Sequence, residues 1–259
     1  MDIRSFFESR WFKCTKFQSY EKYLKNERIP DGDRTIITPE NITIGNMPWQ
    51  EGWNKNYVEG EDPMFRDNLP YDQQGASSDN IKITNDCIIL TKPKEAESKD
   101  AYLYSNFTIK YGTVRALLKT PNVDGIWSAF WLFGTDGMPE HDMIEHCGQW
   151  KNETACTHHW GYDYNGVKGK KSTLWNGRKN KKFKPSEDFN LYEVELGPYK
   201  TVYRLNGKII RTMKHSLSSG LNRIIFDVTK GSYCGTDPKQ AVDADGVMSV
   251  KSIEIFKIH

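Results

Sequence analysis

Residues 125–145 read GIWSAFWLFGTDGMPEHDMIE, and the architecture of the chain can be inferred from this segment outward. An aromatic run comes first, a turn of Gly, Thr, Asp and Pro follows, and three acidic residues then appear at Glu140, Asp142 and Glu145. Alternate side chains of a β-strand share a face, so Glu140 and Asp142 point the same way. Glu145 would point the other way on a regular strand, but one extra residue in a β-bulge returns it to their face. We therefore expect a bulged strand with three carboxylates on one side.

Three carboxylates crowded on one strand face favour a catalytic role, because their mutual repulsion lowers the stability of the fold without any benefit in a non-catalytic protein. Like charges this close push at least one pKa upward, which gives an enzyme one ionised carboxylate and one protonated acid at neutral pH. Double-displacement hydrolysis of a glycoside needs this pair, with carboxyl groups about 5–5.5 Å apart. The alternative is a surface strand that carries three acids by chance, and the acidic string alone leaves both interpretations open.

The remainder of the chain is typical of short strands joined by turns. Residues 81–90 predict a hairpin around Asn85 and Asp86, and residues 203–210 predict another around Asn206 and Gly207. Asn-Gly favours a tight primed turn, because both residues tolerate a positive φ. Many short strands at regular spacing predict an all-β sandwich or barrel.

Composition restricts the classes of function. The chain has 259 residues, which suits one large domain or two small ones, and no break in composition demands a second. A formal net charge of +2 gives no reason to expect nucleic acid or an anionic membrane as a partner. No run of 18 apolar residues could span a bilayer. Aromatic residues make up 13%, enough for a core and for spare rings in a groove, where they commonly stack on sugars or bases.

The cysteines predict little. Their odd number and their spacing fit no zinc pattern and include no C-x-x-C, so at most two disulfides could form, and free buried thiols are the favoured interpretation. The five positions are Cys14, Cys87, Cys147, Cys156 and Cys234.

With these motifs together, the chain resembles glycoside hydrolase family 16, the family of laminarinases, lichenases, agarases and carrageenases. The G-I-W-S-A-F-W run at 125–131 resembles the family's G-[IL]-W-x-A-F-W strand, and the acids follow as in its E-[ILV]-D-x-x-E signature. Further similar segments keep the family order, at residues 104–116, 157–160, 188–195, 203–211 and 246–256. The spacing of the acids resembles the laminarinase, agarase and carrageenase branches more than the lichenases, which lack the extra residue.

The resemblance implies a β-jelly-roll sandwich of two antiparallel sheets with an open concave substrate cleft. It also implies that Glu140 is the nucleophile, Glu145 the acid/base and Asp142 the assisting carboxylate. It covers roughly residues 49–259, so residues 1–48 are predicted to be an extension packed on the catalytic domain. His141 stands where the family has an aliphatic residue, and we expect it to be a hydrogen-bonded inner histidine. For His146 two interpretations stay open: its side chain lies near Glu145 and modulates it, or it faces the core.

Aromatic and polar residues near the acids are the candidates for binding sugar, with core packing as the alternative for the tryptophans. His159 is preferred over its neighbour Trp160, because their side chains alternate. The full set of candidates is Trp127, Trp131, His159, Trp160, Trp53, Trp175, Arg66 and Asn68.

The function expected from the resemblance is retaining, endo-acting hydrolysis of a polysaccharide, with β-1,3- or mixed β-1,3/1,4-glucan favoured. A basic stretch could instead suit a sulfated galactan such as carrageenan, porphyran or agar, by pairing with sulfate, or be a solvated loop. A carbohydrate-binding lectin is the alternative outside enzymes. The basic residues are Lys168, Lys170, Lys171, Arg178, Lys179, Lys181, Lys182 and Lys184.

Cofactors and location are also expectations. No cofactor and no catalytic metal is expected, and a structural calcium ion, as in parts of the family, cannot be located from the sequence. The partner is a polysaccharide, with no nucleic acid and no membrane, and the chain is expected to be a monomer. The first seven residues lack the layout of a signal peptide. A cytoplasmic chain, export by another route and a removed signal peptide all stay open on this ground. A secreted enzyme whose signal has been removed and a phage-encoded depolymerase both fit the polysaccharide substrate, and the location we expect is extracellular.

Overall fold

The computed structural model describes most of the chain from residue 33 onward. The described residues are 33–42, 44–45, 65–67, 75–135, 139–159, 183–214, 220–231, 234–237 and 239–257. In these ranges helical structure is confined to one 3₁₀ turn, η1 (Ser78–Asn80), and to a 3₁₀ conformation at Cys234. No helix in the described part is long and apolar enough to cross a membrane.

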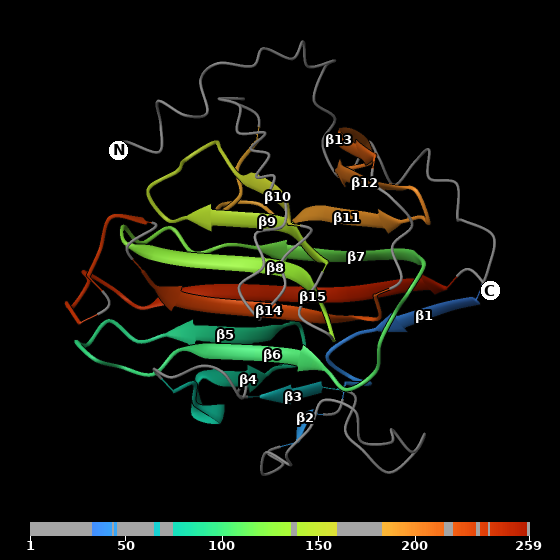
Figure 1. The fold of residues 1–259 in the computed structure, drawn as a ribbon. Helices are drawn as coiled ribbons and strands as arrows, with labels where there is room; N and C mark the ends of the chain where they lie inside the picture. The colour runs from blue at the N-terminus through green and yellow to red at the C-terminus, as the bar shows by residue number, and fades with distance from the viewer. Residues whose placement is uncertain are drawn as a thin grey trace, which may run out of the picture.

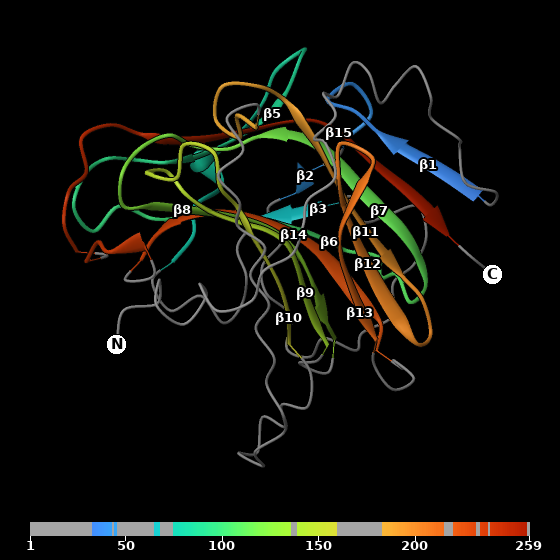
Figure 2. The ribbon, with the colours of Figure 1, turned by 90° about the horizontal axis from the view of Figure 1, so that it is seen from above.

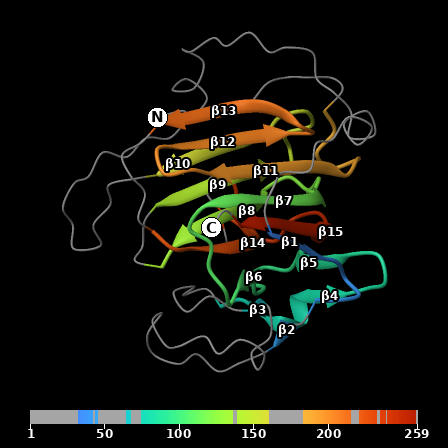
Figure 3. The same ribbon diagram turned by 90° about the vertical axis from the view of Figure 1, so that its right-hand side faces the viewer.

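Two sheets make up the fold (Figure 1). The larger runs in the order β13 (Lys208–Lys214), β12 (Lys200–Leu205), β11 (Asn190–Leu196), β7 (Gly112–Lys119), β15 (Gly246–Lys257), β5 (Ile88–Lys92) and β4 (Ile81–Ile83). β1 (Asp33–Ile37) also pairs with β15. Figure 3 shows this sheet from β13 at one edge to β4 at the other.

The second sheet carries the acidic strand. Its order is β10 (Ala155–His159), β9 (Glu140–Cys147), β8 (Ile126–Gly134), β14 (Asn222–Lys230), β6 (Ala101–Ser105), β3 (Phe65–Asp67) and β2 (Ile44–Gly45). Neighbouring strands in both sheets are antiparallel, except for the parallel pair β2 and β3. Figure 2 shows the two sheets as curved layers that face each other.

The hydrophobic core lies between the two layers. Alternation along the strands supplies it, as in β5, where every second residue is fully buried. Phe130 of β8 and Phe226 of β14 are register partners whose rings stack 4.8 Å apart, and core residues from the larger sheet pack with them. The predicted all-β jelly-roll sandwich is therefore confirmed.

The two predicted hairpins are confirmed. β4 pairs with β5 around residues 84–87, and β12 pairs with β13 around Asn206 and Gly207. These two turn residues have φ angles of 48° and 75°, the left-handed region that a primed turn requires. Local sequence chemistry thus determines the connection.

Strands also occur within the region predicted as an N-terminal extension. β1 pairs with β15 along five residues, and β2 pairs with β3. These residues supply edge pairing to both sheets, in agreement with the short β-type runs in this part of the sequence. The domain boundary at residue 48 stays a prediction.

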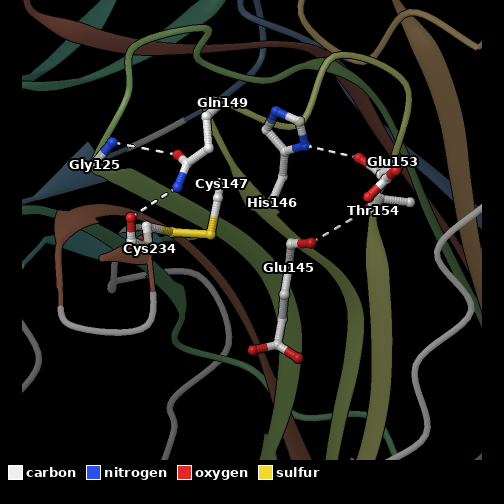
Figure 4. The surroundings of a disulfide bond; sticks show 8 residues. All are labelled: Gly125, Glu145, His146, Cys147, Gln149, Glu153, Thr154 and Cys234. Carbon is white, nitrogen blue, oxygen red and sulfur yellow. Dashed lines mark hydrogen bonds between the residues drawn. A yellow bond between two sulfur atoms is a disulfide. The ribbon is translucent and has the colours of Figure 1, made fainter. Parts of the chain in front are cut away.

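The expectation of free thiols is wrong for one pair of cysteines. Cys147, at the end of β9, forms a disulfide with Cys234, in the loop after β14 (Figure 4). The two are 87 residues apart in the sequence, and the sheet brings them within 5.4 Å between Cα atoms. Cys87 and Cys156 are free, as expected. Cys14 lies outside the described residues.

Candidate active site

A β-bulge in β9 arranges the three acidic side chains. Phe130 of β8 pairs with Ile144 and the next residue, Trp131, pairs with Asp142, so Met143 is the extra residue. Met143 and Ile144 are both fully buried in the core, which is unusual for neighbours on a strand. The bulge therefore shifts the alternation by one residue, as predicted, and Glu145 shares the face of Asp142.

The face that carries the acids is the one turned away from the core. Asp142 lies opposite Trp131 of β8 on one side and Thr157 of β10 on the other. Glu140 lies in the same way between Phe133 and His159. Glu140 and Glu145 are partly exposed, whereas Asp142 is only 4% exposed.

His159 joins two of the acids. Its Nε2 lies 3.2 Å from Asp142 Oδ2 and 3.6 Å from Glu140 Oε1. The imidazole is partly exposed and reaches both carboxylates from the neighbouring strand β10. The structure thus brings together three sequence candidates, Glu140, Asp142 and His159, at one end of the bulged strand.

Glu145 is held by a different pair of residues, both threonines. Thr157 Oγ1 donates a hydrogen bond of 2.5 Å to Glu145 Oε2, and Thr154 Oγ1 donates to the Glu145 carbonyl oxygen at 3.1 Å. Figure 4 shows the Thr154 contact. The sequence analysis missed Thr157, although its position two residues before His159 places both on one strand face.

Aromatic side chains continue the same face beyond the acids. The Trp131 and Phe133 rings meet edge-on at 5.4 Å, in a small cluster with Tyr104 and Ile225. The Trp131 indole Nε1 donates a hydrogen bond of 2.8 Å to Asp227 Oδ1 on β14. Asp227 is another residue that the sequence analysis missed, because only the β14–β8 register places it beside this ring.

Trp127 lies at the other end of β8, opposite Cys147 of β9 and Thr229 of β14. Trp127 and Trp131 are four residues apart on the strand, so their side chains lie on the same face of the sheet. Trp127 comes two residues before Ala129 on β8, and Ala129 pairs with Glu145. Its side chain is partly exposed. Both tryptophans of β8 thus flank the acids, as expected from the alternation.

The two unusual histidines of β9 lie on the core side. His141 is buried, and its Nδ1 lies 2.8 Å from Nδ1 of His158, so the expected inner hydrogen bond is confirmed. His146 is also buried, with its Nδ1 3.0 Å from the Glu153 carbonyl oxygen and its Nε2 3.3 Å from Ser186 Oγ. Burial lowers the pKa of His146 to about 4, so it is neutral at pH 7.

Several candidates cannot be placed. Trp53, Asn68, Trp160 and Trp175 lie outside the described residues. The backbone of Arg66 lies on β3, opposite Tyr104 of β6.

The basic stretch is mostly outside the described residues as well. Only Lys184 can be placed, and it forms an ion pair of 2.8 Å with Glu187. Its charge is therefore partly neutralised by a neighbour in the same turn.

One group of side chains offers donor atoms for a cation. Glu140, Asp142 and His159 each provide one such atom, and the three atoms lie within 4.8 Å of one another. Carboxylate oxygen and imidazole nitrogen are ligands that zinc accepts. The same atoms also lie within contact distance of one another through His159 Nε2, so the absence of a metal requirement stays a prediction.

Comparison with known proteins gives a family match and a small set of similar curated proteins. The model of glycosyl hydrolases family 16 matches residues 71–245, more than half of the chain. Congo red hypersensitive protein 1 of Saccharomyces cerevisiae is 28% identical over 161 residues, which are 62% of this chain and 30% of that protein. The chain spans less than a third of the length of the curated relatives that it matches.

Solved structures share the fold. The catalytic domain of an endo-1,3-beta-glucanase (laminarinase) from Thermotoga petrophila matches with a TM-score of 0.61 at 18% identity, over 87% of this chain and 98% of that one. A Crh5 transglycosylase in complex with NAG matches with a TM-score of 0.56 at 15% identity, over 69% and 76%. These similarities, with the family match, identify a glycosidase or transglycosylase fold that implies a polysaccharide substrate. The chain belongs to glycosyl hydrolase family 16.

Proposed function

We propose that the protein is a retaining, endo-acting hydrolase of a polysaccharide with internal β-linkages. The observation that carries this proposal is the bulge at Met143, which puts Glu140, Asp142 and Glu145 on one exposed face of β9. A binding protein has no use for three carboxylates in such a row, because their mutual repulsion costs stability. A double-displacement hydrolase needs them.

The geometry supports a definite role for each group. Glu140 attacks the anomeric carbon, while Glu145 gives its proton to the leaving glycosidic oxygen, and a covalent glycosyl-enzyme results. Glu145 then removes a proton from water as the water oxygen attacks the same carbon, and the bond to Glu140 breaks. Asp142 and His159 lie beside Glu140 and hold its carboxylate in place.

A β-glucan is the substrate we favour. The partly exposed ring of Trp131 continues the face beside Asp142 and packs edge-on against the buried Phe133, and an exposed ring of this kind stacks on the apolar face of a glucose unit. The laminarinase with which this chain shares its fold is an endo-1,3-beta-glucanase. The alternative is a sulfated galactan, for which the basic residues 168–184 would supply the charge.

The test is a polysaccharide panel followed by proton NMR. Laminarin, mixed-linkage β-glucan, agar, porphyran and carrageenan are each incubated with the protein, and reducing ends are measured. On the best substrate, the anomeric signals of the first minutes should show the β-product before mutarotation, because two inversions restore the configuration. An initial α-product would overturn the roles of Glu140 and Glu145. Binding without any release of sugar would favour a lectin.

A second candidate function, transglycosylation, uses the same glycosyl-enzyme. The structural similarity to a Crh5 transglycosylase supports it. In this reaction a sugar hydroxyl replaces water: its oxygen attacks the anomeric carbon, Glu145 takes its proton, and the bond to Glu140 breaks. A fluorescent oligosaccharide acceptor added to the digest would become part of longer products. If the label stays in the original oligosaccharide while reducing ends accumulate, hydrolysis is the reaction.

The disulfide supports an extracellular location. Disulfides persist in oxidising environments and are rare in a reducing cytosol. Cys147–Cys234 closes a long loop at the end of the strand that carries the acids. We propose that the protein acts outside the cell, where polysaccharide is available to it.

A further inference from the structure

We propose that Thr157 is the positioning residue of the acid/base, fixing which oxygen of the Glu145 carboxyl group carries the transferred proton. The inference rests on the proposed function, because it concerns the acid/base of that reaction. Thr157 lies on β10, across the sheet from the bulge, and its Oγ1 is 2.5 Å from Glu145 Oε2.

The backbone that carries this hydroxyl is itself held in place from two strands. Thr157 is only 2% exposed and lies opposite Asp142 in the register of β9 and β10. From the larger sheet, Tyr203 Oη donates a hydrogen bond of 3.1 Å to the Thr157 carbonyl oxygen. A buried threonine has a restricted χ1, so its hydroxyl has little freedom to leave the carboxylate.

The contact suits a group that must both give and take a proton. A threonine hydroxyl can donate to the ionised carboxylate and accept from the protonated acid. Because the hydrogen bond engages Oε2, we infer that Oε1 gives the proton to the glycosidic oxygen in the first step and takes it from water in the second. The hydrogen bond also favours the ionised form, which the second step requires.

Other charged groups face Glu145 and stay unchanged in the test. Glu140 and Asp142 share its strand face, and His159 of β10 lies against both of them. On β14, Asp227 lies in the same row, with only the small side chain of Ala129 between it and Glu145. These groups set a constant background, so a difference between Thr157 variants reports on the hydroxyl.

The experiment compares Thr157→Val, which removes the hydroxyl at nearly constant volume, with Thr157→Ser, which keeps it. Thr229→Val is the matched control, because Thr229 is a buried threonine of β14 whose hydroxyl contacts only the Lys230 carbonyl oxygen among the contacts described. For the polysaccharide, we expect kcat/KM of Thr157→Val to fall about 10- to 100-fold, as when a hydrogen bond to a charged group is lost. Thr157→Ser should recover most of this loss, and Thr229→Val should show none.

Two readouts separate positioning from a structural role. An oligosaccharide with an activated aryl leaving group needs no protonation, so its kcat/KM should be nearly the same in Thr157→Val and wild type. An equal fall for both substrates would overturn the proposal. The second readout is the carboxyl ¹³C titration of Glu145, assigned with Glu145→Gln, whose midpoint should move to higher pH in Thr157→Val.

The titration needs no substrate, so it distinguishes this inference from the proposed function. If the wild type cleaves or transfers no polysaccharide, the proposed function fails, and the titration still tests the hydrogen bond. Equal midpoints in wild type and Thr157→Val would overturn the inference even in an active enzyme. Circular dichroism of each variant confirms that the fold is intact before either readout is used.

Discussion

Removal of the Cys147–Cys234 disulfide should lower the free energy of unfolding by several kcal/mol. The bond closes a sequence separation of 87 residues, so it restricts the unfolded chain strongly. In the chain-entropy model a closed loop of this length corresponds to about 4.6 kcal/mol at 25 °C. Since the typical free energy of unfolding is about 5–15 kcal/mol, the loss would be a large fraction of the total.

The folded state should change little when the bond is removed, because a side chain bridges the same segments. Gln149 Nε2 donates to the Cys234 carbonyl oxygen at 2.7 Å, and the Gly125 amide donates to Gln149 Oε1 at 3.3 Å (Figure 4). These contacts keep the loop after β14 against the end of β9. We therefore expect the loss to arise in the unfolded chain, which becomes more expanded and gives a larger denaturant m-value.

The assay is equilibrium unfolding in urea at pH 7 for wild type, Cys147→Ala/Cys234→Ala and Cys156→Ala. The double variant should lose about 4 kcal/mol, and wild type in reductant should approach it. Cys156 is a buried free thiol, so Cys156→Ala measures the packing of one sulfur and should cost about 1 kcal/mol. Because this variant keeps the Cys147–Cys234 disulfide, reductant should lower its free energy of unfolding as much as it lowers that of wild type. A double variant within 1 kcal/mol of wild type, at an unchanged m-value, would refute the reasoning.

Three further predictions concern the site and the core. Glu140→Ser and Glu145→Ala should each lower kcat by several orders of magnitude with the fold intact, whereas Asp142→Asn should lower kcat less. Steady-state kinetics measure this, and an active Glu140→Ser would contradict the role of Glu140 as nucleophile. Burial lowers the pKa of His146 to about 4 in the folded state, against 6.5 in the unfolded chain. The neutral imidazole therefore contributes about 3 kcal/mol to the free energy of unfolding above pH 6.5, and this contribution is lost as pH falls through 4. Urea unfolding between pH 7 and 4 should show a shallower loss of stability in His146→Gln than in wild type. Lys230→Met should lower the free energy of unfolding by about 2–3 kcal/mol, because the Lys230 ammonium donates to three backbone carbonyl oxygens that would lose their donor. Lys230→Arg keeps a charged donor, so an equal loss of stability in that variant would contradict this cause.

Features that depend on neighbours in the sequence could be predicted. The turn at Asn206 and Gly207 follows from the φ angles that these two residues tolerate, and the hairpin of β12 and β13 follows from the turn. The bulge could be predicted for a similar reason. Three acids at positions i, i+2 and i+5 reach one face only if one residue between them is added to the strand.

Features that depend on distant pairing could not be predicted. The partner of Cys147 is set by which loop lies beside the end of β9, and five cysteines at unrelated spacings contain no such information. The link from Trp131 to Asp227 requires the register of β8 with β14, which joins residues 96 positions apart. Thr157 is the intermediate case, since its strand face follows from His159 but its distance to Glu145 does not.

The bulge also explains how one short strand serves both the site and the core. Before it, Glu140 and Asp142 face outward and His141 faces the core; after it, Glu145 faces outward and His146 faces the core. Met143 is the added residue, and its side chain enters the core beside Ile144 rather than facing solvent. The insertion therefore leaves the alternation intact on both sides and lengthens the path between Asp142 and Glu145 by one buried residue. Because the antiparallel neighbours have no matching insertion, Thr157 lies opposite Asp142 and still reaches Glu145, so the irregularity of β9 itself creates the contact between Thr157 and Glu145.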